Sequence, residues 1–295
     1  MSLKSYKFIV NPVAGAGKAY SLLPRLKEIM KESGIEYDIY ETREPRDAIE
    51  SARIAAKEGY DIVVAVGGDG TVNEVLNGIV GTKATLAAIH GGKGNDFATA
   101  VKMPIEINSA CKALLDANIR SIDLGKVMDR YFINSVGIGF DAAVAERVNR
   151  GVKPFKGVSA YIYAVLEMLI SYQTTDMEVD LGDGAFTCHP ILVAVGIGQA
   201  YGGGMRILPD AIQDDGFFDV CILDKMKKPF MLYHFPKVFK GELKHLEESN
   251  MFRTREIKIK LSDARPMHLE GEIIRGDYMH FTIEEKAMPV LFGPG

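Results

Sequence analysis

A single carboxylate, Asp69, stands among three glycines in the stretch GGDGT that begins at Gly67. Glycine has no Cβ, so its backbone can approach a ligand closely and can adopt positive φ angles. A strand that runs through such a turn into a helix presents unpaired N–H groups, which bind phosphate. A carboxylate beside a phosphate is repulsive unless a cation separates them, and hydrated Mg²⁺ suits that place. The stretch therefore predicts a magnesium–phosphate site; the alternative is a plain strand–helix turn capped by Thr71.

A second glycine-rich loop, NPVAGAGKAY at residues 11–20, is a candidate for secondary contacts to the same ligand. It fails the P-loop pattern because position 12 is not Gly and position 19 is Ala where Ser or Thr is needed. It also lacks the third glycine of a GxGxxG motif, since Tyr20 stands there. The six histidines form no HExxH motif and the three cysteines no CxxC pair, so neither zinc nor a disulfide framework is expected.

The elements that must position these loops alternate between strand and helix over the first 120 residues. This alternation predicts a parallel sheet covered on both faces, with its ligand site at the carboxyl ends of the strands. The expected strands are 7–12, 37–42, 61–66 and 84–90, and the expected helices are 22–34, 45–59, about 71–80 and one from near Asn95.

Beyond about residue 125, strand-like segments predominate and Gly, Asp or Pro turns separate most of them. Helical patterns interrupt them at 158–172 and at about 229–241, where Pro236 breaks or kinks the second helix. Many strands with few helices predict an antiparallel sandwich or barrel. We therefore expect an α/β domain over 1–125, to which 285–295 is a candidate addition, a mainly-β domain over 126–284, and a ligand site in the cleft between them.

Composition excludes several classes of protein. A chain of 295 residues with 47% hydrophobic and 25% charged residues is typical of a soluble protein. The net charge of −4 offers no overall attraction to nucleic acid or to anionic lipid. The N-terminal MSLKSYKF lacks the apolar core of a secretory leader. The apolar run 159–172 carries Glu167 and is too short to cross a bilayer, so a cytoplasmic protein without transmembrane segments is expected.

GGDGTVNEV, residues 67–75, resembles the nucleotide-binding signature of the diacylglycerol kinase catalytic family, especially its soluble bacterial lipid kinases. Five blocks in the family's order make the resemblance specific, whereas GGDG alone is shared with NAD kinases. The resemblance spans nearly the whole chain and implies a three-layer α/β domain, similar to phosphofructokinases and NAD kinases, followed by a C-terminal antiparallel β-sandwich. The other four blocks are NPVAG (11–15), GNDFA (94–98), YGGGMRILPDAIQDDGFFDV (201–220) and LEGE (269–272).

The resemblance implies an ATP- and Mg²⁺-dependent kinase that phosphorylates the hydroxyl of diacylglycerol or a related lipid at the membrane surface; it leaves a homodimer open. Asp69 would organise magnesium-bound water, Glu74 would lie close to the phosphates, and Glu272 would accept the proton of the lipid hydroxyl. The residues that it implies for ATP are Asn11, Thr42, Gly67, Gly68, Asp69, Gly70, Thr71, Val72, Asn73, Lys93, Asn95 and Asp96.

The second-domain signature carries an implied metal site of its own. The carbonyls of Ile212 and Phe217 and the carboxylate of Asp215 match a structural magnesium site of bacterial members. Oxygen ligands, partly from the backbone, are those that a hard cation prefers. Without the resemblance, the Asp-Gly step after Asp214 would be interpreted as a turn.

The strand MHLEGEII carries two carboxylates, Glu270 and Glu272, which a period of two would place on one face. Two like charges at that distance raise the pKa of one carboxyl group, which suits a group that must accept a proton. The strand therefore predicts Glu272 as the proton acceptor with Glu270 tuning it. The alternative is an exposed polar strand edge.

Two departures from the family keep other functions open. HGGK (90–93) replaces the family's Pro-Leu-Gly-Thr, so Lys93 stands in place of a threonine and either contacts phosphate as a point charge or faces solvent. Glu270 replaces an Asp and lengthens the side chain by one methylene. The alternative functions are a kinase of a soluble acceptor such as NAD, and a nucleotide-binding regulatory protein without turnover.

Overall fold

The computed structural model describes residues 4–152, 154 and 158–294, so the first three residues of the N-terminal stretch considered above for a leader lie outside it. The chain forms two compact units. One comprises residues 1–124 together with 284–295, and the other comprises residues 125–283. The chain passes from the first unit to the second near residue 124 and returns near residue 284.

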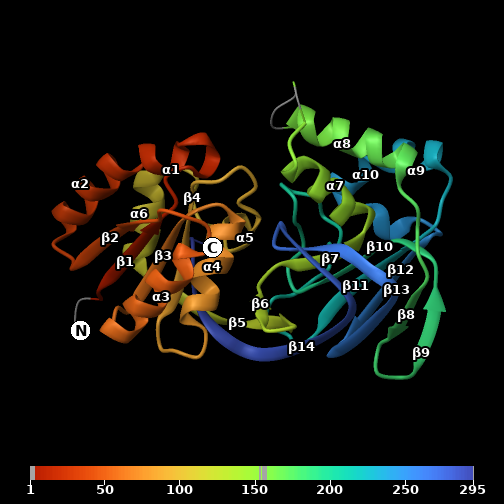
Figure 1. The fold of residues 1–295 in the computed structure, drawn as a ribbon. Coiled ribbons are helices and arrows are strands. Elements are labelled where there is room, and N and C mark those ends of the chain that lie inside the picture. The colour runs from red at the N-terminus through yellow and green to blue at the C-terminus, as the bar shows by residue number, and fades with distance from the viewer. Residues whose placement is uncertain (1–3, 153, 155–157, 295) are drawn as a thin grey trace. The chain divides into compact units, whose positions relative to one another are not determined.

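A parallel sheet forms the centre of the first unit (Figure 1). Its strands are β1 (Tyr6–Val10), β2 (Tyr37–Glu41), β3 (Ile62–Gly67) and β4 (Thr85–His90), in the order β4-β3-β1-β2. The end of β14 (Glu272–Phe292) joins β4 in parallel, where Val290 pairs with Leu86. Every residue of β1, β3 and β4 is buried, as expected of parallel strands with both faces covered.

Helices cover both faces of this sheet: α3 and α4 pack together on one face, and α2 and α6 on the other (Figure 1). Gly34 and Gly59 end α2 and α3 in left-handed conformations, so both expected ends are confirmed. The expected start of α4 at Thr71 is wrong by two residues, because extended Gly68 is the N-cap and Asp69 already lies in the helix. The helices of this unit are η1 (Ala14–Ala16), α1 (Lys18–Ser21), α2 (Leu23–Ser33), α3 (Asp47–Glu58), α4 (Asp69–Ile79), α5 (Asp96–Ala100) and α6 (Ile107–Asp116).

The second unit is built on antiparallel strands in the order β12-β11-β10-β7-β13-β14. The long strand β13 pairs with β8 through its first half and with β7 through its second half, and its register against β14 shifts between Lys260 and Arg265. β5 (Asn118–Val127) runs from the first unit into the second. The other strands are β6 (Arg130–Phe132), β7 (Ser135–Gly139), β8 (Met177–Asp180), β9 (Ala185–Cys188), β10 (Pro190–Gly196), β11 (Phe218–Asp224), β12 (Ser249–Thr254) and β13 (Glu256–Leu269).

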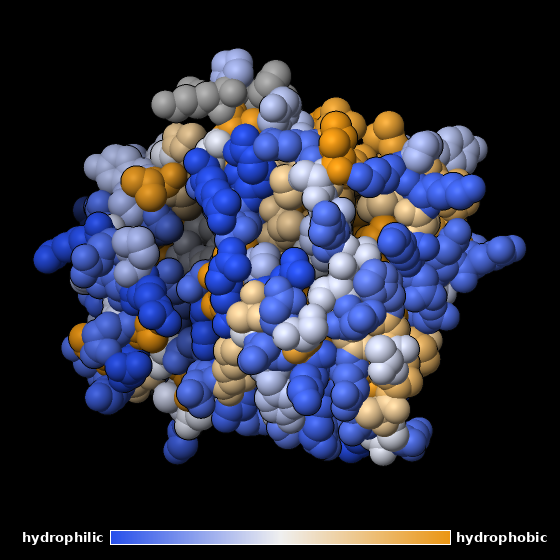
Figure 2. Space-filling model, turned by 45° about the vertical axis from the view of Figure 1, so that its right-hand side comes forward, coloured by the Kyte–Doolittle hydropathy of each residue, from blue (hydrophilic) through white to orange (hydrophobic). Residues whose placement is uncertain are grey.

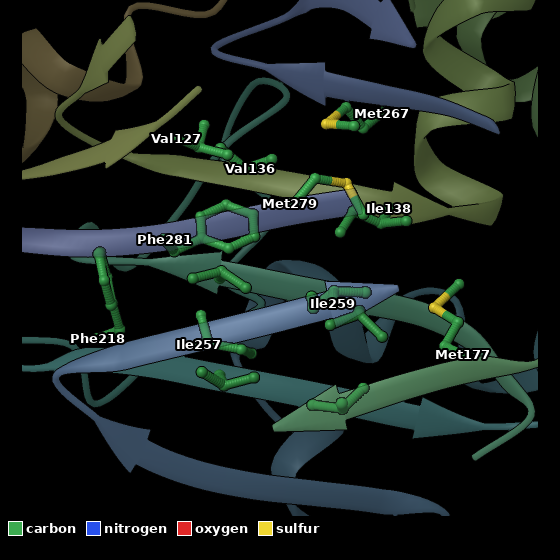
Figure 3. Packing of buried hydrophobic residues seen from close by; sticks show 14 of the residues in the cluster. Val127, Val136, Ile138, Met177, Phe218, Ile257, Ile259, Met267, Met279 and Phe281 are labelled. Atoms are coloured by element: carbon green, nitrogen blue, oxygen red, sulfur yellow. The ribbon is translucent and has the colours of Figure 1, made fainter. Parts of the chain in front are cut away.

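The core of the second unit lies between these strands (Figure 3). The rings of Phe132 and Phe218 stack with centroids 5.9 Å apart, and Phe281 meets Phe132 edge-on at 6.2 Å. Met177, Met267 and Met279 lie in the same cluster. Burial of each phenylalanine stabilises the fold by about 1.5–3 kcal/mol. The strands therefore supply apolar side chains to one shared core, as a β-sandwich requires.

Helices of the second unit pack outside this core. The pattern at 229–241 forms two short helices, because Phe235 and Pro236 separate α9 from α10. The sequence did not predict α7, whose residues FDAAVAERVN show no clear apolar stripe. No helix in the described part of the chain is long and apolar enough to span a membrane. The helices are α7 (Phe140–Asn149), α8 (Val158–Ser171), α9 (Lys228–His234), α10 (Lys237–Lys240) and η2 (Leu243–His245).

Candidate active site

The predicted phosphate loops all leave the sheet of the first unit at one edge. Asn11 directly follows β1, and Thr42 directly follows β2. In the ladder, Val10 pairs with both Glu41 and Val66, and Gly67 pairs with His90. The carboxyl ends of four neighbouring strands therefore carry these residues together, as parallel pairing dictates.

The glycines after β3 and β4 let two backbones lie directly against each other. The N–H of Gly91 donates to the carbonyl of Gly67 at 2.9 Å. A Cβ on Gly92 would lie 2.3 Å from the Cα of Gly68, which is a clash. None of Gly67, Gly68 and Gly70 has a positive φ, so the expectation that they allow unusual backbone angles is wrong. Gly67 and Gly68 instead avoid close contacts, since a Cβ would lie 2.4 Å from the Thr71 hydroxyl oxygen and 3.2 Å from the Gly92 Cα, respectively.

The first loop joins the same cluster. A Cβ on Gly15 would lie 2.4 Å from the carbonyl oxygen of Gly91. The Asn11 amide donates to the Thr71 hydroxyl at 3.3 Å, so Thr71 packs inwards and does not cap α4. Gly70, in contrast, has open space where a Cβ would stand. Three loops thus meet backbone to backbone around the start of α4, and Gly70 leaves its surface clear.

Asp69 links the glycine turn to the GND loop. It is the first residue of α4, is half-buried, and its Oδ1 accepts the backbone N–H of Phe97 at 3.0 Å. The side chain of Asn95 bonds twice to Gly92: Oδ1 accepts the N–H at 2.7 Å and Nδ2 donates to the carbonyl at 3.0 Å. The Asn95 side chain therefore shapes its own loop, while Asp69 lies at the helix N-terminus, where anions are favoured.

The remaining residues predicted to bind the nucleotide differ in their exposure to solvent. Val72 and Asn73 are only 3% and 2% exposed, so their side chains lie inside the unit. Lys93 is exposed, and Asp96 is buried at the start of α5. Glu74 accepts the backbone N–H of Arg46 at 3.1 Å, an anchoring contact at the start of α3 that the sequence did not reveal.

The two carboxylates of the LEGE block do not share a strand face, so that expectation is wrong. Leu269 pairs with Glu272 across a two-residue turn formed by Glu270 and Gly271, both of which have positive φ. The turn breaks the alternation of side chains that a continuous strand would have. Glu270 is consequently buried, while Glu272 begins β14 on the exposed side.

Their partners also differ. Glu270 Oε1 accepts the backbone N–H groups of Ile133 and Asn134 at 2.8 and 2.7 Å, and its Oε2 accepts the Asn134 amide at 3.1 Å. Glu272 pairs with Arg130 at 2.8 Å and keeps a side chain that is 49% exposed. Glu270 therefore fixes the turn between β6 and β7, and Glu272 is the carboxylate that solvent or a ligand can reach.

In the loop around Asp215, where a structural metal is expected, the positive charge beside the carboxylate comes from an arginine. Asp215 forms an ion pair with Arg253, and its Oδ1 also accepts the N–H of Phe217 at 3.1 Å. The Arg253 guanidinium lies 4.8 Å above the Phe217 ring and 3.9 Å from Asp219 Oδ2. A cation bound by Asp215 would have to displace the guanidinium, and the ligand set of Ile212, Asp215 and Phe217 stays a prediction.

Several buried or half-buried polar residues have partners that the sequence did not reveal. Asp123 is fully buried in the first unit and accepts the N–H of Lys286 at 2.7 Å. Asp141 accepts the Tyr201 hydroxyl and contacts His268 Nε2, both at 2.8 Å. His90 contacts the carbonyl of Met103 at 2.7 Å, and burial lowers the pKa of its ring. No spacing signal joins these pairs, because their partners are distant in sequence or lack a motif.

Two family models together cover most of the chain. Residues 5–127 match the diacylglycerol kinase catalytic domain, and residues 134–292 match the YegS C-terminal NAD kinase beta sandwich-like domain. These matches confirm the predicted family, and they confirm the predicted fold class of an α/β domain followed by a β-sandwich.

Relatives and solved structures agree with these models. A diacylglycerol kinase of Bacillus subtilis (strain 168) is 30% identical over 275 residues, which is 92% of this chain and 90% of the relative. One of Staphylococcus haemolyticus (strain JCSC1435) is 30% identical over 277 residues, covering 93% and 82%. A solved diacylglycerol kinase structure from Bacillus anthracis str. Sterne covers 100% of this chain and 98% of its own, at 21% identity and a TM-score of 0.78. This chain therefore belongs to the diacylglycerol kinase family and is a lipid kinase.

Proposed function

We propose that this protein transfers the γ-phosphate of ATP to the hydroxyl of diacylglycerol or a closely related lipid, with Mg²⁺ as cofactor. One observation carries the proposal: three glycine-rich loops meet around the Asp69 end of α4, and a Cβ at several of their glycines would clash. The relatives named diacylglycerol kinase support the choice of lipid. The protein would work in the cytoplasm, at the membrane surface.

The phosphates of ATP would lie over the start of α4. Backbone N–H groups and the positive end of the helix dipole favour an anion there. Gly67, Gly68 and Gly70 would admit the phosphates, and Thr71 would contribute mainly through its backbone because its side chain is buried. The N–H of Val72 donates to the Gly68 carbonyl at 3.1 Å, so Val72 and Asn73 would act by holding the first turn of α4. The further residues proposed around the nucleotide are Asn11, Thr42, Lys93, Asn95 and Asp96.

The donor set at this place fits a hydrated divalent cation. Asp69 is half-buried, and of its two oxygens only Oδ1 has a hydrogen bond among the described residues. Mg²⁺ bound through water would neutralise charge on the phosphate oxygens. The contact to Phe97 would hold the carboxylate in a fixed position, and oriented groups need little reorganisation during transfer.

The acceptor side would use the exposed carboxylate of the LEGE block. We assign to Glu272 the role of accepting the proton of the lipid hydroxyl, late in the transfer. Its ion pair with Arg130 would orient it at the β13–β14 turn. Glu270, which the sequence suggested as an electrostatic neighbour, is instead proposed as a positioning residue that holds this turn.

The test is transfer of radiolabel from [γ-³²P]ATP to a panel of acceptors: diacylglycerol, phosphatidylglycerol, a sphingoid base and NAD. We expect label in the diacylglycerol product, dependent on Mg²⁺ and lost in Asp69→Asn. Labelling of NAD alone would replace the proposal with a soluble-acceptor kinase. ATP binding without transfer to any acceptor would indicate a regulatory protein.

A further inference from the structure

One face of the second unit exposes large apolar side chains from three helices. We call it the α8–α10 face. Ile170 and Tyr233 are the most exposed of these side chains, at 78% and 75%. Figure 2 shows hydrophobic groups gathered beside hydrophilic ones at its upper right. The apolar residues of the face are Ile162, Tyr163, Leu166 and Ile170 on α8, Phe230, Leu232 and Tyr233 on α9, and Phe239 on α10.

Helix α8 is apolar on two sides, although only one side is needed for packing. Ala164, Val165 and Leu169 are buried against α7 and the side chains of α9. Leu166 and Ile170 point outwards and contribute nothing to that cluster. A helix that packs on one face of a globular protein normally carries polar residues on the other. The outward apolar row therefore points to a second partner.

The ends of α8 and α9 are joined at this face. The Lys228 ammonium group donates to the carbonyl of Ile170. Between the two helices lies a cavity of about 340 Å³, whose lining includes Met168, Tyr172 and Met226 together with Lys225. The lining mixes these apolar side chains with polar ones, among them Gln173, Thr174 and Lys228, so apolar and positively charged groups meet at this place on the face.

The second half of the face, formed by the segment 225–241, carries positively charged side chains and no negatively charged ones. The segment 225–241 contains no Asp or Glu, within a chain whose net charge is −4. The acidic residue of α8, Glu167, is paired with Arg147 at 2.8 Å. Apolar and aromatic side chains surrounded by lysines are the pattern of proteins that lie on anionic bilayers. The lysines of the segment are Lys225, Lys227, Lys228, Lys237 and Lys240.

We propose that the α8–α10 face docks this protein on the surface of an anionic phospholipid bilayer. Ile170 and Tyr233 would enter the headgroup region, and the lysines would lie beside the lipid phosphates. The inference deepens the proposed function, because a kinase whose substrate is embedded in a bilayer must reach it. Docking itself needs neither ATP nor turnover, so it can be measured separately.

The experiment is co-sedimentation of the full chain with vesicles, without ATP or diacylglycerol. Vesicles of phosphatidylglycerol mixed with phosphatidylcholine are compared with phosphatidylcholine alone. We expect binding to the anionic vesicles only, weakened by salt. The double variant Ile170→Glu/Tyr233→Glu should bind at least tenfold more weakly, and the triple variant Lys225→Gln/Lys237→Gln/Lys240→Gln should do the same. Lys228 is left intact because it joins the two helices.

Matched controls come from the first unit. Ile105 is 72% exposed, and Ile105→Glu should bind as the parent does. A control triple variant, Lys31→Gln/Lys57→Gln/Lys83→Gln, removes three positive charges from exposed positions of the first unit. Its affinity for the anionic vesicles should fall less than twofold. Unchanged melting temperatures would show that all variants are folded. Equal losses in the controls, or parent-like binding of the face variants, would overturn the proposal.

Two further readouts separate the alternatives. Light scattering that finds a dimer for the parent and a monomer for Ile170→Glu would make the face an interface between two copies, against the proposal. Activity on diacylglycerol dispersed in detergent should survive the face variants within twofold. If docking fails while that activity remains, only this inference falls; if no lipid is phosphorylated, the proposed function falls and the vesicle result still stands.

Discussion

The Asp69 carboxylate and the backbone N–H of Phe97 form a hydrogen bond of 3.0 Å that joins the turn after β3 to the start of α5. Asp69→Asn keeps an oxygen at this position, so we expect a melting temperature within about 2 °C of the parent. Asp69→Ala leaves the Phe97 N–H without its partner and should lose about 1 kcal/mol of stability. Thermal denaturation of both variants measures this difference. An Asn variant as unstable as the Ala variant would contradict the contact.

The glycines of the site should separate into structural and ligand-facing positions. Gly92→Ala places a methyl group 2.3 Å from the Gly68 Cα and should cost about 1–3 kcal/mol. Gly70 lies in α4 with open space around it, so Gly70→Ala should gain about 0.5–1 kcal/mol, as alanine does in a helix. Denaturant titration gives both values.

The substitution Gly70→Ala should change stability and ATP affinity in opposite directions. We expect Gly70→Ala to bind ATP more weakly despite its higher stability, because its methyl group would stand where the phosphates are proposed to lie. Isothermal calorimetry measures this. Unchanged ATP affinity in Gly70→Ala would remove the phosphates from this part of α4.

The neighbouring carboxylates Glu270 and Glu272 should respond differently to the same change. Glu270→Gln turns one acceptor oxygen into a donor beside buried N–H groups and should cost about 1–3 kcal/mol. Glu272→Gln removes an exposed ion pair worth about 0–1 kcal/mol, yet it should lower kcat strongly with ATP affinity unchanged. Thermal denaturation and steady-state kinetics distinguish the two. Wild-type turnover in Glu272→Gln would exclude its role as proton acceptor.

Arg253 should supply the positive charge that the loop around Asp215 needs. Arg253→Met removes the partner of Asp215 and leaves Asp219 buried beside it, so we expect a clear loss of stability. Arg255→Met is the matched control, since Arg255 also stacks on Phe217 at 4.9 Å. The parent's melting temperature should be the same in EDTA and in Mg²⁺. A stabilisation of the parent by Mg²⁺, abolished in Asp215→Ala, would restore the metal site at this loop.

Much of the fold was predictable because local signals and long-range pairing agree. Short apolar runs before glycine-containing loops predicted β1, β3 and β4, and the segment YDIYET predicted β2. Parallel pairing then required Asn11, Thr42 and Gly67 to share an edge. Helix ends at Gly34 and Gly59 follow from their left-handed conformations. The glycine turn of residues 67–70 was recognisable from its composition alone.

The failures have specific physical causes. Glu270 and Glu272 appeared to share a strand face, but Glu270 itself takes a positive φ, which glutamate rarely adopts and sequence does not signal. The partner of Asp215 lies 38 positions away on β12, so its ion pair depends on the pairing of β11 with β12. Helix α7 carries too weak an apolar stripe to be separated from the strand before it.

The central claim is that the Asp69 site transfers phosphate from ATP to a lipid hydroxyl. The most direct measurement is the initial rate of ³²P transfer to diacylglycerol in detergent micelles, for the parent and for Asp69→Asn, with and without Mg²⁺. We expect Mg²⁺-dependent labelling by the parent and a rate at least 100-fold lower for the folded Asn variant. Labelling by Asp69→Asn at the parent's rate, or no lipid labelling by the parent, would contradict the claim.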